Sequence, residues 1–388
     1  MPETEILITG ATGLLGGAVL FQALRENPDL RWTALSRGAS EGHARARIAA
    51  RLARFSDAAT GTALAARLHV IPGDIFAAAA LPGAVLARTT HVLHLAADTS
   101  FASKESNWRV NFDGTMALAG AAAGMPRLSR FLHCSTATIC GGGASTHVLE
   151  AEYPREDVAH LVHYTHAKAQ AEMALAQRFP QLPVVVARPS IVAGHSTLGA
   201  RPSTSIFWFL RAVEALGLTS CEPTGGIDVV PSDWTAAALL HLLFKPELAA
   251  RRYHLSAGID SRAHWPEMLR AFAAARGPDA AINPASRFDM ARPDVLRRRF
   301  RACFGHGDAR LALMLRACRK YYEFCALDVT FDNAALLAEG MAPPPAMPEY
   351  LATCLANPPG QSVFDAFLED ADMFLPETTA TTPAMAAE

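Results

Sequence analysis

The sequence predicts an α/β protein built on a doubly wound parallel sheet, followed by a smaller and mostly helical region. Three observations predict this fold class. Short apolar runs alternate with helical patterns through the first half of the 388 residues. That alternation is typical of strand–helix–strand units, whose parallel sheet is covered by helices on both faces. A glycine-rich turn directly follows the first apolar run, and after about residue 189 helical patterns take over.

Six strands are expected in the first part, each an apolar run bounded by turn residues. They lie at 5–9, 31–36, 68–72, 91–95, 130–135 and 184–187. The helices expected between them lie at 14–25, 43–55, 107–123 and 164–179. Because crossovers between parallel strands are right-handed, successive helices then cover both faces of the sheet.

The second part is expected to be mostly helical, with two short strands. The strands lie at 227–230 and 252–256, and the helices at 203–216, 234–243, 293–300, 310–322 and 333–338. We interpret this part as a cap that packs on the carboxyl edge of the sheet. The apolar cluster at 206–210 either fills the core of the cap or lines an acyl tunnel, and the core is the favoured interpretation.

The composition excludes several classes of protein. Hydrophobic residues make up 51% of the chain, charged residues 19%, and the formal net charge is −2, so a nucleic-acid-binding face is not indicated. The basic run Arg45, Arg47, Arg51 and Arg54 on the helix at 43–55 is interpreted as a solvated face. No apolar run reaches the roughly 18 residues of a membrane span.

The chain ends and the cysteines bear on the compartment. Glu3 and Glu5 stand where a signal peptide would need basic residues, so no signal peptide is expected. The seven cysteines form no Cys-x-x-Cys pair, which argues against a zinc site or a disulfide framework. We therefore expect no metal and a cytoplasmic location.

The glycine-rich turn has the spacing G-x-x-G-x-x-G at Gly10, Gly13 and Gly16, between a predicted strand and a predicted helix. In this context the pattern is that of a dinucleotide-binding Rossmann fold. The first glycine allows the tight turn, the second lets the backbone approach a pyrophosphate, and the third lets the helix pack on the strand. The pyrophosphate would bind the N–H groups of the helix N-terminus. The predicted loop contacts are Gly10, Thr12, Gly13, Leu14, Leu15 and Gly16.

The end of the second strand distinguishes NAD from NADP. An acidic residue there would bind the ribose hydroxyls of NAD. This chain has Ser36-Arg37-Gly38, and the Arg37 guanidinium suits a 2′-phosphate. Arg47 is a candidate second contact, and Glu41 is the nearby residue that would argue for NAD. The expected cofactor is therefore NADP(H).

These elements define an expected domain organisation. An NADP-binding Rossmann domain is expected at 1–200, with sheet elements continuing to about 260. The substrate-binding cap is expected at 201–375. The segment 376–388 is rich in Thr, Ala and Pro and is expected to be a disordered tail.

Tyr164 and Lys168 form a Y-x-x-x-K pair, which lies on one face of a helix. A tyrosine phenol has a pKa near 10, and a nearby lysine cation is expected to favour the phenolate. In the reducing direction the phenol donates a proton to a developing oxyanion. The fifth strand ends in Ser135-Thr136, at the sheet edge that faces the ligand. Thr136 is the preferred second donor to the substrate oxygen, with Ser135 as the alternative.

The chain resembles the extended short-chain dehydrogenase/reductase superfamily over about its first 200 residues. The matching motifs are TGATGLLGG, GDI, HLAA, VNFDGT, CSTATICG, YTHAK and ARPSIVAG. The resemblance implies a catalytic set of Thr136, Tyr164 and Lys168, with Asn111 supporting the active-site geometry, and Lys168 also reaching the nicotinamide ribose. It further implies cofactor contacts at Asp74, Ile75, Ala96, Ala97, Pro189 and Ile191, with Tyr164 and Lys168 beside the nicotinamide.

Within the superfamily the chain is most similar to the fatty acyl-CoA reductase and carrier-protein thioester reductase branch. The similarity rests on Arg37, ARPSIVAGHSTLG, DVVPSDW at 228–234 and VTFDN at 329–333. It implies reduction of an acyl thioester, brought by coenzyme A or an acyl carrier protein, to the aldehyde and in some members to the alcohol. The alternatives are a nucleotide-sugar epimerase or dehydratase, a hydroxysteroid-type dehydrogenase, and a non-catalytic NADP sensor.

Other chemistry-bearing residues are weighed against simpler roles. His160, His163 and His166 are spaced like metal ligands, but two of them flank the tyrosine on a face already assigned. His195 and Ser196 are equally compatible with substrate contact and with a loop role. Cys134 and Cys140 flank the catalytic hydroxyl, but no base partner for a nucleophile is identified.

Overall fold

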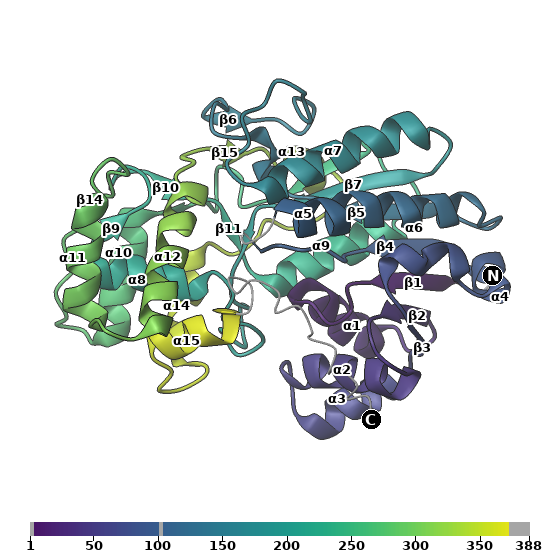
Figure 1. The fold of residues 1–388 in the computed structure, drawn as a ribbon, viewed down its shortest axis with the longest axis horizontal. Helices are drawn as coiled ribbons and strands as arrows, with labels where there is room; N and C mark the ends of the chain where they lie inside the picture. The colour runs from purple at the N-terminus through teal and green to yellow at the C-terminus, as the bar shows by residue number, and fades with distance from the viewer. Residues whose placement is uncertain (1–3, 101–103, 372–388) are drawn as a thin grey trace, which may run out of the picture.

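The computed structural model of the protein describes residues 4–100 and 104–371. The expected tail at 376–388 lies outside the described residues. Figure 1 shows two parts side by side: a sheet flanked by helices, and a cluster of helices at the other end of the molecule. Among the described residues, no helix combines the length and the apolarity that crossing a membrane requires.

The central sheet has seven strands, all parallel, in the order β3-β2-β1-β4-β5-β7-β12. The strands are β1 (Glu5–Thr9), β2 (Arg31–Ser36), β3 (His69–Pro72), β4 (His91–His94), β5 (Arg130–Cys134), β7 (Val184–Pro189) and β12 (Arg252–Leu255). The strand order reverses between β1 and β4, and ligands of such sheets bind in the crevice outside the strand ends at this point. The expected doubly wound fold class is confirmed.

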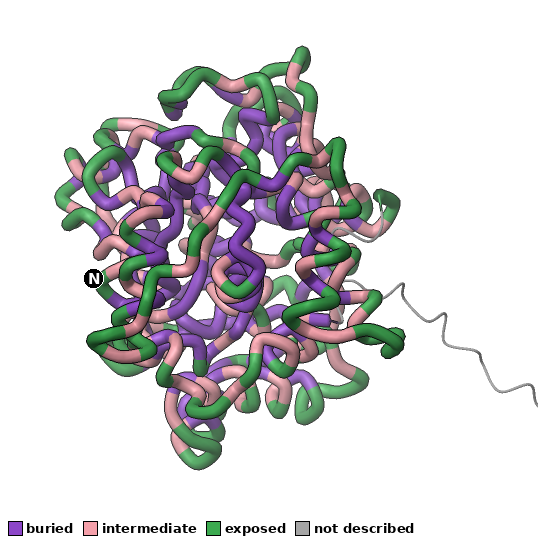
Figure 2. Tube along the Cα trace, turned by 90° about the vertical axis from the view of Figure 1, so that its left-hand side faces the viewer, coloured by how far each residue is buried: buried purple, intermediate pink, exposed green. Residues whose placement is uncertain are grey.

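Helices cover both faces of the sheet because residues of each strand alternate between two apolar cores. Ile6 and Ile8 of β1 pack in a core with α1 (Leu14–Glu26), α2 (Glu41–Ala53), α3 (Ala58–Ala66) and α9 (Ser232–Phe244). Leu7 faces the opposite core, with α6 (Gly114–Ala123) and α7 (His163–Arg178). Figure 2 shows the resulting buried interior inside an exposed outer layer.

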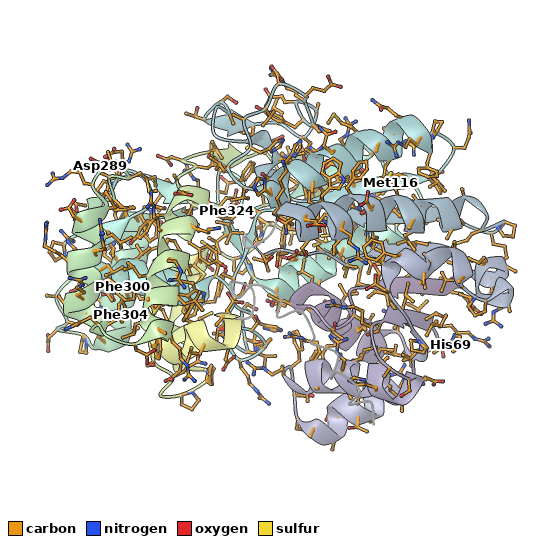
Figure 3. The ribbon with its side chains drawn as sticks, viewed as in Figure 1. His69, Met116, Asp289, Phe300, Phe304 and Phe324 are labelled. Carbon is orange, nitrogen blue, oxygen red and sulfur yellow. The ribbon has the colours of Figure 1, made fainter. Side chains whose placement is uncertain are left out.

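The C-terminal helices gather around an aromatic core of their own. They are α8 (Phe207–Leu216), α10 (Trp265–Arg276), α11 (Pro293–Phe304), α12 (Ala309–Phe324), α14 (Met347–Ala356) and α15 (Val363–Asp370). Phe209 stacks on Tyr321 at 5.3 Å and meets Tyr322 edge-on at 4.9 Å, measured between ring centroids. The cluster at 206–210 is buried in this core, which confirms the core interpretation. Figure 3 shows Phe300 and Phe304 in this cap, far from His69 in the sheet domain.

The structure differs from the expected elements in several places, including three helices. The helix expected at 107–123 is α5 (Lys104–Trp108), a π-helical turn at Arg109–Asp113, and then α6. Helix α8 begins at Phe207 instead of residue 203, after Ser205 adopts a positive φ of 33°. Helix α3 was not expected, because its alanine-rich sequence has no clear apolar stripe.

Candidate active site

The turn between β1 and α1 has the geometry of a pyrophosphate cradle. Gly10 has a φ of +78°, and a Cβ added there would lie 2.5 Å from the carbonyl carbon of Leu95. A Cβ at Gly16 would overlap the carbonyl oxygen of Gly10. Helix α1 begins after Gly13 with no side-chain cap and no acidic residue in its first turn. Its first N–H groups therefore remain available to an anion, and the residues present fit a dinucleotide.

Arg37 and Arg47, two predicted contacts for a 2′-phosphate, lie together at the end of β2. Arg37 is exposed directly after the strand. Arg47 reaches back from α2 and donates from Nη1 to the carbonyl oxygen of Arg37 at 2.6 Å. The Arg47 guanidinium thus lies against the Arg37 backbone at the end of β2, on the side where the adenosine of a bound dinucleotide is expected.

The other predicted cofactor residues lie at strand ends along the same edge of the sheet. Asp74 follows β3 and caps a 3₁₀ turn at Ile75–Ala80 by accepting from the Phe76 amide at 3.3 Å. Ala96 and Ala97 follow β4. Pro189 is the last residue of β7, and Ile191 opens the short strand β8 (Ile191–Val192).

Thr136, Tyr164 and Lys168 come together at the ends of β5 and β7. Lys168 is 1% exposed, and its Nζ donates to the Cys134 carbonyl at 2.8 Å. The Thr136 hydroxyl lies 2.9 Å from the Thr138 hydroxyl and 3.4 Å from the Pro189 carbonyl oxygen, and it also hydrogen-bonds the side chain of Tyr164. The hydroxyl of Thr136, which follows β5, therefore meets the phenol and the ammonium of α7.

Burial is the main influence on the protonation of Tyr164 and Lys168. Burial raises the pKa of the Tyr164 phenol above its ordinary value, with a further increase from Cys134 and a smaller opposing effect from the Thr136 hydrogen bond. Burial also lowers the pKa of Lys168. Because burial is the largest influence on the pKa of the phenol, the expected effect of the lysine cation on the phenolate stays a prediction. The phenol stays protonated, as a proton donor requires.

Asn111 lies in the π-helical turn between α5 and α6, and π turns often mark functional positions. Its side-chain amide donates to the Asp98 carbonyl at 2.8 Å and accepts from the Asp98 amide at 3.0 Å. Asn111 therefore fixes the backbone that follows β4 and the two alanines, in keeping with the supporting role that the resemblance implies. Its contacts are made through this backbone and not directly with Tyr164 or Lys168.

A buried chain of hydrogen bonds connects the Asn111 turn to β1. Thr115 donates to the Asn111 carbonyl at 2.7 Å, so its oxygen accepts from His94 Nε2 at 3.0 Å. His94 Nδ1 then accepts from the Thr9 hydroxyl at 2.8 Å, and Thr9 accepts from the Ala96 amide at 3.2 Å. Burial, with the Lys168 charge, lowers the pKa of His94 to about 3, so the ring is neutral and each bond direction is determined.

A buried ion pair that sequence reasoning missed joins β7 to α7, the helix that contains Tyr164 and Lys168. Arg188 in β7 is 0% exposed, and its Nη2 lies 2.6 Å from Glu172 Oε2 of α7. Arg188 also donates to the carbonyls of Glu150 at 2.8 Å and Tyr153 at 2.6 Å, in the segment before Tyr164. The signal in the sequence is a lone arginine inside the apolar run of β7, which requires a buried partner.

The basic run on α2 is not the solvated face that the sequence suggested. Arg45 donates to the carbonyls of Ala65 and Leu68, both at 2.8 Å. Arg51 donates from Nε to the Thr12 carbonyl at 2.8 Å. The interpretation is wrong because arginine side chains reach backbone carbonyls of neighbouring segments, which the helical spacing alone does not reveal.

The remaining candidates have structural partners. His160 and His166 have ring centroids 5.3 Å apart, and no cluster of potential metal ligands occurs among residues 4–100 and 104–371. Ser196 donates from its amide to Asp233 at 2.9 Å, and its hydroxyl also bonds that carboxylate. Burial raises the pKa of Cys134 to about 11 and that of Cys140 to about 12, so neither thiol is an activated nucleophile.

Comparisons with known proteins agree with this geometry. A non-canonical nonribosomal peptide synthetase, FrzA of Cladobotryum sp, is 26% identical over 275 residues, which are 65% of this chain and 26% of that protein. The chain thus spans about a quarter of the length of the curated synthetases it matches. The terminal R domain of the myxalamid PKS-NRPS pathway superposes with a TM-score of 0.75 at 22% identity, over 92% of this chain and 90% of that one.

A second solved structure has a similar fold. It is a thiolation-reductase di-domain from an archaeal nonribosomal peptide synthetase, with a TM-score of 0.67 at 17% identity, over 95% of this chain and 76% of that one. A family model described as male sterility protein, an NAD-binding family, matches residues 8–239, which is more than half of the chain. The chain therefore belongs to this family, and it is an NAD(P)-dependent oxidoreductase of the extended short-chain dehydrogenase/reductase type.

Proposed function

We propose that the protein is an NADPH-dependent reductase of acyl thioesters. The observation that carries the proposal is the meeting of Thr136, Tyr164 and Lys168 at the sheet edge, where strand β4 separates it from the pyrophosphate cradle. A phenol that burial keeps protonated is suited to donating a proton to an oxygen that gains negative charge. The similarity to R domains supports a thioester as the group that carries this oxygen.

Each residue has a defined task in the reaction. Bound NADPH supplies a hydride to the thioester carbonyl carbon. Tyr164 donates its proton to the oxygen, Thr136 donates a second hydrogen bond, and Lys168 holds its positive charge beneath the pair. The carbon–sulfur bond then breaks, so that one thioester, one NADPH and one proton give aldehyde, thiol and NADP⁺. Solvent returns the proton to Tyr164, and a second round on the aldehyde would give the alcohol.

NADPH is preferred over NADH because of the positive corner at the end of β2. Arg37 and Arg47 lie together there, and no carboxylate follows the strand directly. A 2′-phosphate would gain charge-assisted hydrogen bonds from both guanidinium groups, whereas a 2′-hydroxyl would gain little. The acyl group is proposed to arrive on coenzyme A or on the phosphopantetheine of a carrier protein, in line with the synthetases that the chain partly matches.

The proposal is tested with the variant Tyr164→Phe and a matched control. NADPH oxidation is followed with acyl-CoA, aldehyde and nucleotide-sugar substrates. Loss of one oxyanion donor typically costs on the order of 100-fold or more in rate, so Tyr164→Phe should lose at least that in kcat with acyl-CoA while NADPH affinity is retained. The control Tyr322→Phe removes a phenol of the cap, whose hydroxyl donates to the Leu218 carbonyl at 2.9 Å, and should keep its kcat.

The substrate panel distinguishes the alternatives. Turnover of nucleotide sugars without turnover of acyl-CoA or aldehyde would replace the thioester reductase by an epimerase or dehydratase. Tight NADPH binding with no turnover of any substrate would indicate a sensor. Unchanged turnover in Tyr164→Phe would remove this residue from the mechanism.

A further inference from the structure

A cavity of about 440 Å³ lies between the cofactor domain and the cap, next to the pyrophosphate cradle. Thr12 of the cradle forms part of one wall, together with Arg47, Arg51, Arg54 and Ala50 of the α2 segment. These arginines are spaced four and three residues apart, so they share one helix face. The opposite wall comes from the cap, through 202–204 and Glu369. Thr12 and Arg47 are predicted cofactor contacts, whereas the other lining residues have no predicted functional role.

Arg51 spans the two walls of this cavity. Its Nε donates to the Thr12 carbonyl at 2.8 Å, and its Nη1 donates to the Pro202 carbonyl at 2.9 Å. The side chain crosses the first turns of α1 at Gly17, where an added Cβ would lie 2.6 Å from Arg51 Cγ. A glycine in a helix lowers the stability of that helix by about 1 kcal/mol relative to alanine. At position 17 the missing side chain leaves the space through which Arg51 reaches the loop.

The charges around the cavity do not balance. Arg54 pairs with Glu369 at 2.7 Å and donates to the Arg201 carbonyl at 3.0 Å. Arg51, which is half-buried, bonds only neutral carbonyls, and no carboxylate of residues 4–100 or 104–371 lies within ion-pair distance of it. Burial and the neighbouring charge of Arg54 lower the pKa of Arg51. A partly buried, uncompensated guanidinium on a cavity wall is what a bound anion would stabilise.

We propose that this cavity, which we call the Arg51 site, binds a phosphate or diphosphate group of a ligand that contacts the cofactor loop and the cap at once. The proposal rests on the proposed function, because that reaction brings two ligands of this chemistry to the protein. One is the diphosphate of the nicotinamide cofactor, and the other is the phosphate of an acyl-bearing phosphopantetheine or coenzyme A. The Ser203 hydroxyl adds a polar group on the cap side, whereas the Thr204 hydroxyl already donates to the Ala366 carbonyl at 2.9 Å. Because Arg51 joins Thr12 to Pro202, a ligand held here also ties the cap to the cofactor loop.

Two binding titrations distinguish the two sources of the phosphate, and neither depends on turnover. In the first, NADPH is titrated into wild type, Arg51→Met and Arg51→Lys. In the second, coenzyme A and pantetheine are titrated into each protein saturated with NADP⁺. Losing one charge-assisted contact should weaken the phosphate-bearing ligand by about 10- to 100-fold in Arg51→Met, with a smaller loss in Arg51→Lys. Weaker NADPH assigns the site to the cofactor, and weaker coenzyme A with unchanged pantetheine assigns it to the acyl donor.

The matched control is Arg45→Met. Arg45 stands on the same helix and donates to two backbone carbonyls, but it does not line the cavity. Both ligands should bind this variant as they bind wild type. A second variant, Ser203→Asp, leaves the bonds of Arg51 in place and puts a negative charge on the cavity wall, so it should weaken the same ligand even if Arg51→Met folds poorly.

The outcomes separate this proposal from the proposed function. If Arg51→Met and Ser203→Asp bind NADPH, coenzyme A and pantetheine like wild type, the Arg51 site is refuted, and Arg51 only joins the two parts of the fold. Equal weakening of coenzyme A and pantetheine would also refute it, because pantetheine has no phosphate. A wild type that binds these ligands but reduces no thioester would overturn the proposed function and leave the Arg51 site standing.

Discussion

Replacing Thr115 with valine removes one hydroxyl from the buried chain that joins Asn111 to β1 and changes almost nothing in volume. Thr115 and His94 are both 0% exposed, so water cannot replace the lost partner. In the variant the N–H at His94 Nε2 has no acceptor, and the Asn111 carbonyl loses a donor. Thr115→Ser is the matched control, because it keeps the hydroxyl and loses only the methyl group.

The magnitude follows from the two lost hydrogen bonds. A buried donor without a partner costs about 1–3 kcal/mol, and the second bond contributes about 1 kcal/mol, so Thr115→Val should lose about 2–4 kcal/mol of stability. Thr115→Ser should lose about 1 kcal/mol, the value of a buried methyl group. Unfolding entropy is about 2.1 cal/mol/K per residue, or about 0.8 kcal/mol/K for 388 residues. The valine variant should therefore melt roughly 1–4 °C below the serine variant.

The assay is thermal unfolding of wild type and both variants, with NADPH oxidation measured at a temperature where all are folded. Turnover of Thr115→Val should fall far less than that of Tyr164→Phe, because no group that touches the reacting carbonyl has changed. A valine variant as stable as the serine variant would refute the proposed series of hydrogen bonds from Asn111 to Thr9. It would mean that the hydroxyl does not connect His94 to Asn111.

Two further predictions concern the cofactor and pH. Arg37→Gln should raise KM for NADPH by about 10- to 100-fold and leave KM for NADH nearly unchanged. The control is Arg298→Gln, which replaces an exposed arginine of the cap. Equal effects on both cofactors would contradict the assignment of Arg37 to the 2′-phosphate. Burial and the nearby Asp332 raise the pKa of Glu150 from 4.5 to about 7. The folded protein therefore binds the Glu150 proton more tightly than the unfolded chain does. The resulting stabilisation is fully present below pH 4.5 and is lost as the pH rises through 7. Urea midpoints of wild type should therefore fall from pH 5 to pH 8 relative to Glu150→Gln, and parallel curves for the two proteins would rule out Glu150 as the cause.

Local sequence was sufficient for those parts of the site that depend on backbone sterics and helical spacing. Gly10 needs a positive φ, and Gly16 has no room for a side chain, so the cradle is visible as a glycine pattern. Tyr164 and Lys168 share a helix face because they are four residues apart. The seven strands were likewise predictable, because parallel strands buried on both faces are continuous apolar runs.

The sequence by itself thus determined the fold class, the cradle and the tyrosine–lysine pair, whereas tertiary structure decided how these parts are connected. Thr9 and His94 bond across 85 residues, and Arg51 reaches Pro202 across 151, and neither spacing leaves a periodic signal. The protonation of Tyr164 depends on burial, which comes from segments distant in sequence. The arginines of α2 have the spacing of a solvated face. That face becomes the wall of a cavity only because the pyrophosphate cradle and the cap pack against it. Long polar side chains choose their partners after the backbone is in place, so their roles cannot be read from local pattern.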